Sequence, residues 1–221
     1  MPASKACFSG PGSAEEAELF AALADGLYQQ GYVIRPNALN PTLAPTLYDY
    51  IQTLSPAHFV RAGVGRGQNL SHNRFVRTDR ICWITGEDPV PASWLAFCER
   101  LRRYLNRHLM LGLFSFESHF AHYSPGDFYR RHLDAFKGES NRVVSLVSYL
   151  NPDWQPEDGG ELVLWRPDDT TVRVTPQLGT LALFMSEEFP HEVRPAQRDR
   201  YSIAGWFRLN TSTALRPDPP R

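Results

Sequence analysis

The sequence has little cysteine, no long apolar run and almost no net charge, and each shortage excludes a class of protein. Its three cysteines, Cys7, Cys82 and Cys98, are an odd number without close spacing, which argues against a disulfide framework and a cysteine-based zinc site. No stretch approaches the roughly 20 apolar residues of a membrane span, and Met1 to Gly12 lacks the features of a signal peptide. The formal net charge of −1 provides no basic surface for nucleic acid or anionic membrane. We therefore expect a cytoplasmic protein that binds neither.

The composition is that of an ordinary globular domain. The chain has 221 residues, of which 42% are hydrophobic and 21% are charged. This length suits one domain, which we place at residues 13–209, and a monomer is expected. Residues 1–12 and 210–221 are expected to be flexible, since the low-complexity end Arg216–Arg221 is rich in proline.

The first half of the chain has helical periodicity. Ser13 and Glu16 form a capping-box pattern at the start of an apolar stripe, and Gly31 is a natural terminator. Further stripes follow at helical spacing, so we interpret residues of about 13–115 as a helical layer. The expected helices lie between Ser13 and Gly31, from about Pro41 to Leu54, and from about Pro91 to Leu109.

From Phe116 onward the chain changes to short β-rich runs separated by turn residues. The expected strands are Phe116–Tyr123, Tyr129–Asp134, Arg142–Leu150, Glu161–Trp165, Thr171–Val174, Thr180–Phe184, His191–Arg194 and Tyr201–Leu209. About eight such strands indicate a sandwich or barrel. We expect an α+β fold, with a double-stranded β-helix (jelly roll) at about 116–209 and the N-terminal helices packed on one sheet. Arg61–Asn73 is expected to be a mobile loop near the active site.

His132-Leu-Asp134 is the first pattern that indicates chemistry. On a strand, residues i and i+2 point to the same face, so His132 and Asp134 are expected to lie together. One imidazole and one carboxylate supply two ligands of a facial triad, which with a second histidine holds iron(II) and leaves coordination positions open. By itself the pattern is weak, since the tripeptide occurs by chance in many proteins, and an ordinary surface strand explains it better.

The downstream sequence strengthens this interpretation. His191 follows the apolar run Thr180–Phe184, and Arg200 comes nine residues later at the start of another apolar run. A hairpin between these runs would bring Arg200 near the metal, where a guanidinium can bind a carboxylate in a bidentate manner. The alternative is an arginine at the rim, paired with Glu187 or Glu192. We call His132, Asp134 and His191 the triad.

The other five histidines lack a spaced partner. His58, His72 and His108 fall in helical or loop contexts, whereas His119 and His122 lie three apart on one strand and so face opposite sides. We interpret them as structural or surface residues.

With the triad and Arg200 placed, the chain resembles the prolyl hydroxylase branch of the 2-oxoglutarate oxygenases. The resemblance is strongest to the oxygen-sensing prolyl hydroxylases that act on hypoxia-inducible factor and to their bacterial relatives, and it covers roughly residues 74–209. One departure is a glycine-rich insert shortened here to Asp127-Phe128. The matching segments, in order, are Arg77–Gly86, Tyr123–Gly126, His132–Asp134, Arg142–Trp154, Gly159–Leu162, His191–Pro195 and Arg200-Tyr201 with Trp206.

The resemblance implies roles for single residues. The triad would bind Fe(II), Arg200 and the Tyr149 hydroxyl would bind the distal carboxylate of 2-oxoglutarate, and Tyr123 would line the pocket. By itself, Tyr149 could be a plain core tyrosine.

Further residues would form the substrate rim. Arg142 would pair with Asp79 at the entrance and contact the peptide, while Arg77, Trp83 and Trp206 would support that rim. Without the resemblance, Arg142 and Asp79 could be a plain surface ion pair, and the two tryptophans could be core residues.

The function that the resemblance implies is prolyl hydroxylation of a protein by a dioxygenase that uses Fe(II), 2-oxoglutarate and O₂, with ascorbate in support, and yields succinate and CO₂. The substrate would be an exposed proline-containing loop hydroxylated at the 4-position, with elongation factor Tu as the first bacterial candidate and oxygen sensing as a family role. The alternatives are an oxygenase of a small molecule or nucleobase, and a non-catalytic metal-binding jelly roll that binds a partner.

Overall fold

The computed structural model of the protein describes residues 12–63, 75–135 and 141–210. Most of the expected loop Arg61–Asn73 lies outside these residues. So do nearly all of the two ends that were expected to be flexible.

Three α-helices come from the first half of the described chain: α1 (Ala14–Gln30), α2 (Leu43–Thr53) and α3 (Pro89–Leu109). The Ser13 side chain accepts a hydrogen bond from the amide of Glu16 at 3.1 Å, and Gly31 ends α1 with a φ of 72°, as the sequence predicted. The reciprocal bond of the expected capping box is absent, because the Glu16 carboxylate pairs with Arg100 of α3 at 2.6 Å. None of the described helices is long and apolar enough to cross a membrane.

The strands form two antiparallel sheets. The major sheet has seven strands in the order β1 (Tyr32–Arg35), β9 (Leu181–Met185), β6 (Arg142–Tyr149), β11 (Arg200–Arg208), β4 (Ser115–Tyr123), β3 (Arg80–Trp83) and β2 (Val60–Arg61). The minor sheet has four strands in the order β5 (Tyr129–His132), β10 (His191–Val193), β7 (Leu162–Trp165) and β8 (Thr171–Val174). Short 3₁₀ turns lie at η1 (Pro56–His58) and η3 (Pro156–Asp158).

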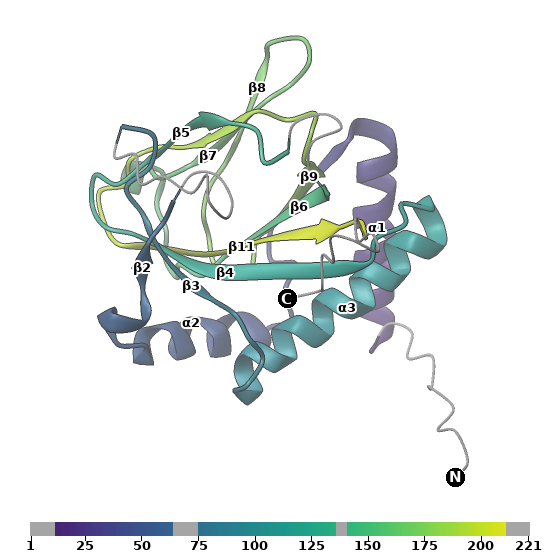
Figure 1. Cartoon of the computed structure of the whole chain (residues 1–221), viewed down its shortest axis with the longest axis horizontal. Coiled ribbons are helices and arrows are strands. Elements are labelled where there is room, and N and C mark those ends of the chain that lie inside the picture. Colours follow the sequence, from purple (N-terminus) through teal and green to yellow (C-terminus); the bar gives the residue numbers. More distant parts are fainter. Residues whose placement is uncertain (1–11, 64–74, 136–140, 211–221) are drawn as a thin grey trace, which may run out of the picture.

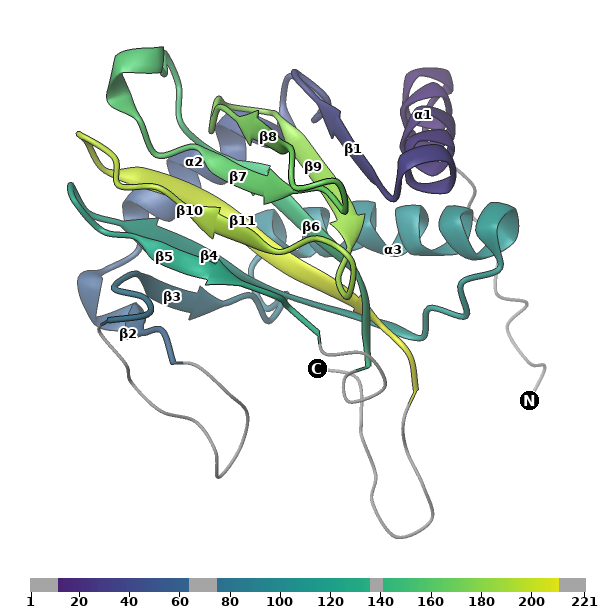
Figure 2. The same ribbon diagram turned by 90° about the horizontal axis from the view of Figure 1, so that it is seen from above.

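The layers are arranged as the sequence predicted. Figure 1 shows α2 and α3 beneath the major sheet and β5 and β7 above it, and Figure 2 shows the minor sheet lying over β4, β11, β6 and β9. One apolar core fills the space between the helices and the major sheet, and a second fills the space between the sheets. This is the expected α+β fold, a jelly roll with a helical layer on one sheet.

Two details differ from expectation. The half expected to be helical also contributes β1, β2 and β3 to the major sheet. The strand expected over Tyr129–Asp134 ends at His132, because β5 pairs with β10 only as far as the His132–His191 register. Asp134 therefore lies in the bend after the strand.

Candidate active site

The triad comes together at the inner end of the minor sheet. His132 on β5 and His191 on β10 are directly opposite each other in the antiparallel register. Asp134 reaches both from the following bend: its Oδ1 lies 3.5 Å from Nε2 of His132 and its Oδ2 lies 3.5 Å from Nε2 of His191. One ligand atom from each residue lies within 4.8 Å of the others. These are the three residues that the sequence grouped together. They meet because the two histidines pair across neighbouring strands, and not because His132 and Asp134 alternate along one strand.

Backbone carbonyls select the tautomer of both histidines. Nδ1 of His132 lies 2.8 Å from the carbonyl oxygen of Arg130, and Nδ1 of His191 lies 3.0 Å from that of Phe189. A carbonyl can only accept, so Nδ1 carries a proton, and in the neutral ring the lone pair is on Nε2. Burial lowers the pKa of His191 to about 4, so this ring is neutral at pH 7. Both Nε2 atoms are ready to bind a cation.

The carboxylate of Asp134 is held in its ionised form. Burial alone would raise its pKa, but the neighbouring His191, the hydrogen bond to His132 and the positive charge of Arg142 bring the pKa well below its usual range. The hydroxyl of Ser145 on β6 donates to Oδ2 of Asp134 at 2.7 Å. Two imidazoles that turn Nε2 towards an oriented carboxylate fit iron(II) in donor type.

Replacing Ser145 with alanine is expected to weaken iron(II) binding about tenfold, because groups that orient a metal ligand typically contribute this much. Anaerobic iron titration measures it. Ser148→Ala is the matched control, since Ser148 is buried on the same strand but lies an odd number of positions away, on the opposite face. Equal iron affinity in the Ser145→Ala variant and the unaltered protein would show that this hydroxyl does not orient Asp134.

Arg200, at the start of β11, is a buried cation. It is 1% exposed, its Nε donates to the Gly160 carbonyl at 2.8 Å, and its Nη1 donates to Ser202 Oγ at 3.2 Å. Within the described parts of the chain it forms no ion pair, so the alternative of a rim arginine paired with Glu187 or Glu192 is wrong. A buried charge without a counter-ion is unfavourable, which indicates that an anion binds here.

Two tyrosines border Arg200. Its guanidinium carbon lies 4.9 Å from the ring centre of Tyr123 and 5.3 Å from that of Tyr149. Tyr149 is fully buried, and its hydroxyl has no hydrogen-bond partner in the described structure. Since buried hydroxyls are nearly always bonded, the orphaned hydroxyl and the unpaired guanidinium together fit a carboxylate ligand.

Arg200, with Tyr123 and Tyr149, and the triad lie on the same side of the major sheet, towards the minor sheet. Tyr123 and Tyr149 belong to the apolar cluster between the two sheets, and so does Phe184. The ring of Phe184 lies 4.7 Å from that of His191 in edge-on contact. Arg200 with its two tyrosines and the triad therefore border the same apolar cluster between the sheets.

Gly160 keeps the Arg200 side of the pocket open. Its φ is +69°, and a Cβ built there would lie 2.9 Å from Cβ of Ala196 and 3.1 Å from Cδ of Arg200. Any side chain would therefore be strained and would displace the guanidinium. The close approach of Ala196 and Arg200 to the backbone explains why glycine is needed at position 160.

Arg77 and Asp79 form a bidentate ion pair beside the metal ligands. Nε and Nη2 of Arg77 lie 2.8 and 2.6 Å from the two carboxylate oxygens of Asp79. The guanidinium lies 4.1 Å from the ring centre of Tyr129, and that ring stacks on His132 with centres 3.5 Å apart. The Arg77–Asp79 pair therefore packs behind His132 through the ring of Tyr129.

The expected ion pair between Arg142 and Asp79 is wrong. Arg142 instead bonds Glu117, at 3.2 Å from Nε and 3.0 Å from Nη2. The reason is the position of each residue along β4. Arg142 of β6 is opposite Arg208 of β11, which is opposite Ser115 at the start of β4. Asp79 precedes Arg80, which is opposite His122 near the end of β4.

Trp83 and Trp206 flank His119 on the inner face of the major sheet. The centre of the His119 ring lies 5.2 Å from that of Trp83 and 5.5 Å from that of Trp206, both in edge-on contact. Trp206 is 8% exposed and Trp83 is 39% exposed. His119 Nδ1 and Trp206 Nε1 are buried without hydrogen-bond partners in the described chain, so this wall of the pocket retains unused polar atoms.

His119 predicts a pH dependence of stability. Burial, with repulsion from Arg77 and Arg142, lowers its pKa from 6.5 to about 3. As the pH falls, His119 is therefore protonated in the unfolded chain before it is protonated in the folded protein. The free energy of unfolding decreases as the pH falls from 6.5 towards 3, by up to about 1.4 kcal/mol per pH unit. The free energy of unfolding of the metal-free protein, measured with urea, should decrease less between about pH 7 and about pH 5 in His119→Gln than in the unaltered protein. The exposed His58, changed to glutamine, is the control; equal slopes in all three proteins would contradict the assignment.

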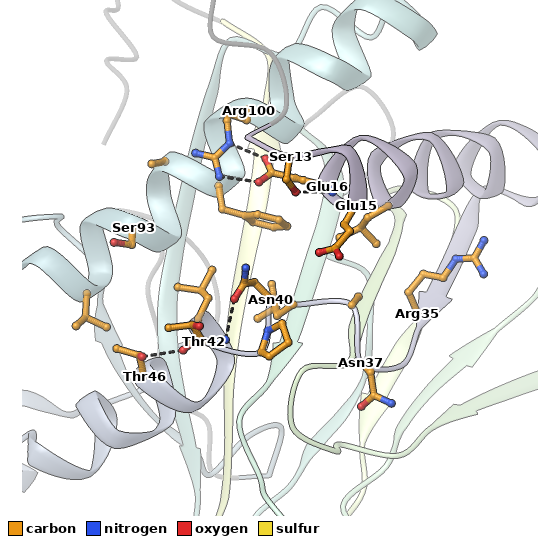
Figure 3. Close-up of a pocket in the computed structure, with 18 of the residues that line it drawn as sticks. Ser13, Glu15, Glu16, Arg35, Asn37, Asn40, Thr42, Thr46, Ser93 and Arg100 are labelled. Atoms are coloured by element: carbon orange, nitrogen blue, oxygen red, sulfur yellow. Dashed lines mark hydrogen bonds and ion pairs between the residues drawn. The ribbon is translucent and has the colours of Figure 1, made fainter.

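A separate cavity of about 920 Å³ lies on the helix side of the major sheet. Figure 3 shows the Glu16–Arg100 ion pair at one edge and Asn40 and Thr42 opposite. Its lining includes the first turns of α1, α2 and α3 and none of the triad. It is therefore distinct from the candidate active site.

Sequence reasoning missed three residues that shape the site: Ser145, Glu117 and Tyr129. Strand alternation could have found two of them. Ser145 lies four positions before Tyr149, and Glu117 lies six positions before Tyr123, so each shares a face with a predicted site residue. No comparable signal marks Tyr129, whose stacking on His132 depends on the fold.

The chain is similar to known proteins over most of its length. Residues 118–208 match the model of the 2OG-Fe(II) oxygenase superfamily. The human protein Egl nine homolog 1 is 28% identical over 151 residues, which is 63% of this chain and 35% of that protein, so the chain spans about a third of this relative's length. A Pseudomonas putida prolyl-4-hydroxylase structure is 39% identical, with a TM-score of 0.79 over 86% of this chain and 98% of that one. A Trichoplax adhaerens prolyl hydroxylase, solved with a peptide fragment of the hypoxia-inducible factor oxygen degradation domain, is 28% identical, with a TM-score of 0.75 over 86% and 89%.

Proposed function

The chain belongs to the 2OG-Fe(II) oxygenase superfamily, and on this premise we propose that it hydroxylates prolyl residues of a protein substrate. The observation that supports this best is the pairing of two sites in one interior. A two-histidine, one-carboxylate cluster lies at one sheet, and a buried guanidinium with an orphaned tyrosine hydroxyl lies at the other. A 2-keto dicarboxylate has one end suited to each.

We assign the residues as follows. His132, Asp134 and His191 would hold Fe(II), and Arg200 with the Tyr149 hydroxyl would hold the distal carboxylate of 2-oxoglutarate. Tyr123 would close the apolar wall beside it. When bound, Fe(II), 2-oxoglutarate and O₂ supply the oxidising power to convert a C–H bond to C–OH, with succinate and CO₂ as coproducts.

The protein's own contribution is binding and orientation. The two Nε2 lone pairs and the Asp134 carboxylate leave part of the metal's coordination open. The apolar cluster between the sheets excludes water, which strengthens the Arg200–carboxylate contact. Ser145 and the Arg77–Tyr129 stack restrict the motion of the metal ligands.

The substrate is proposed to be an exposed proline-containing loop of another protein. Arg142, Trp206, Trp83, and the Arg77–Asp79 pair would form its rim. We further propose 4-hydroxylation by a monomer in the cytoplasm, with ascorbate supporting turnover and with elongation factor Tu as the first bacterial target to test. A role in oxygen sensing is part of the same proposal.

The test is incubation with Fe(II), 2-oxoglutarate and ascorbate, with and without a library of proline-containing peptides. The proposal predicts succinate formation that peptides stimulate, and a peptide mass increase of one oxygen atom on proline. Succinate without peptide oxidation would favour a small-molecule or nucleobase substrate. No succinate under any condition would favour a non-catalytic metal-binding module.

A further inference from the structure

A buried carboxylate lies between two arginines on the major sheet. Glu117 on β4 is 5% exposed. Its Oε1 accepts hydrogen bonds from Nε and Nη2 of Arg142, at 3.2 and 3.0 Å, and its Oε2 lies 3.3 Å from Nη1 of Arg208. An acidic side chain is seldom buried unless it is paired, so this arrangement needs a reason.

The three residues come from three neighbouring strands. In the register, Trp206 of β11 is opposite Glu117 of β4, and Arg208 of β11 is opposite Arg142 of β6. To reach Glu117, Arg142 extends from β6 across β11. Its guanidinium carbon consequently lies 3.5 Å from the ring centre of Trp206, within the range of a cation–π contact.

This cluster adjoins the metal ligands. Trp206 is flanked across the sheet by Glu117 on one side and by Ser145 on the other, and Ser145 donates to Asp134. Glu117 also shares the inner face of β4 with His119, whose ring contacts Trp206. Arg142 is thus held at the wall where a peptide bound beside the metal would lie.

Arginine loses considerable rotamer entropy when it is ordered. Arg142 is ordered here by two charge-assisted hydrogen bonds on one edge and an aromatic ring against its plane. Arg208 restrains the carboxylate from its other side. Without the Glu117 carboxylate, Arg142 would lose both of these hydrogen bonds, and repulsion from Arg208 would favour movement of Arg142 away from Trp206.

We propose that Glu117 is a positioning residue for substrate recognition, which holds Arg142 flat on Trp206 so that the guanidinium can donate to a backbone carbonyl near the target proline. The inference rests on the proposed function and deepens it. Glu117 acts through Arg142, so its effect should fall on peptide binding and leave the chemistry of 2-oxoglutarate intact.

The experiment uses the full chain loaded with Fe(II), and the best-hydroxylated peptide of a synthetic single-proline library. Glu117→Gln is expected to raise the peptide KM about tenfold, the effect of weakening a charge-assisted hydrogen bond. The kcat, the KM for 2-oxoglutarate and peptide-independent succinate formation should stay unchanged. Glu16→Gln is the matched control, because it removes another carboxylate that pairs with an arginine, on the helix side.

A double-mutant cycle separates positioning from general packing. In an Arg142→Ala background, Glu117→Gln should raise the peptide KM no further; a further tenfold rise would overturn the proposal.

Glu117→Asp keeps the charge that the fold needs but shortens the side chain, so its peptide KM should also rise. If Glu117→Gln does not fold, an unchanged KM in Glu117→Asp overturns the proposal. If the unaltered protein hydroxylates no peptide, the proposed function and this inference fail together, whereas an unchanged KM in the variants overturns only this inference.

Discussion

Asp134→Ala is expected to abolish 2-oxoglutarate turnover, with or without peptide. Asp134 is the only carboxylate of the triad and its oxygens lie 3.5 Å from Nε2 of both imidazoles, so the variant retains two imidazoles and no carboxylate to balance the charge of the metal. Groups that merely orient a ligand contribute ten- to a hundredfold in metal affinity, and removal of the ligand should exceed about a hundredfold. Succinate formation and anaerobic iron stoichiometry are the two measurements.

Asp199→Ala is the control for this experiment. Asp199 also pairs with an imidazole, at 2.7 Å from Nε2 of His122, but its side chain is exposed. Iron binding and turnover should survive that change. Full turnover in Asp134→Ala would show that the metal is held elsewhere.

Arg200→Ala is expected to raise the KM for 2-oxoglutarate by about a hundredfold or more, while iron affinity stays unchanged. The guanidinium is the one buried cation next to the orphaned Tyr149 hydroxyl in the described structure. Losing a bidentate charge-assisted contact in a dry pocket removes roughly 3 kcal/mol of binding free energy, which corresponds to more than a hundredfold.

Thermal unfolding gives a second measurement of the same change. Adding 2-oxoglutarate to the metal-loaded unaltered protein should raise its Tm, because the ligand binds only the folded state. The Arg200→Ala variant should show no such rise at the same concentration. Arg198→Ala, which removes a more exposed arginine on the same turn, should respond like the unaltered protein. A normal Tm response in Arg200→Ala would contradict the assignment.

The sequence correctly predicted those features that depend on residues close together in the chain. Ser13 and Gly31 bound α1 because capping uses groups within a few residues. Most strands of the second half were found because alternation and turn residues are local signals. The triad and Arg200 were predicted because their order and spacing resemble those of a known family; the fold brings the three triad residues together and buries Arg200.

The sequence did not show which distant groups meet. β1 pairs with β9, about 150 positions later in the chain, and local periodicity carries no information about such a partner. The Arg142–Asp79 pair was wrong for the same reason, since only the sheet register shows that these residues align with opposite ends of β4. Asp134 lies after β5 rather than within it because the pairing with β10 ends at His132.

By itself, then, the sequence determined the layer architecture, the grouping of His132, Asp134 and His191 and the family chemistry, since these depend on local pattern and motif. The tertiary structure alone decided how that site is held. It set the histidine tautomers through backbone carbonyls, left Arg200 buried without an acid in the described chain, and placed Glu117 between two arginines. Burial and cross-strand contact create these properties, and both arise only when the two sheets have closed over the pocket.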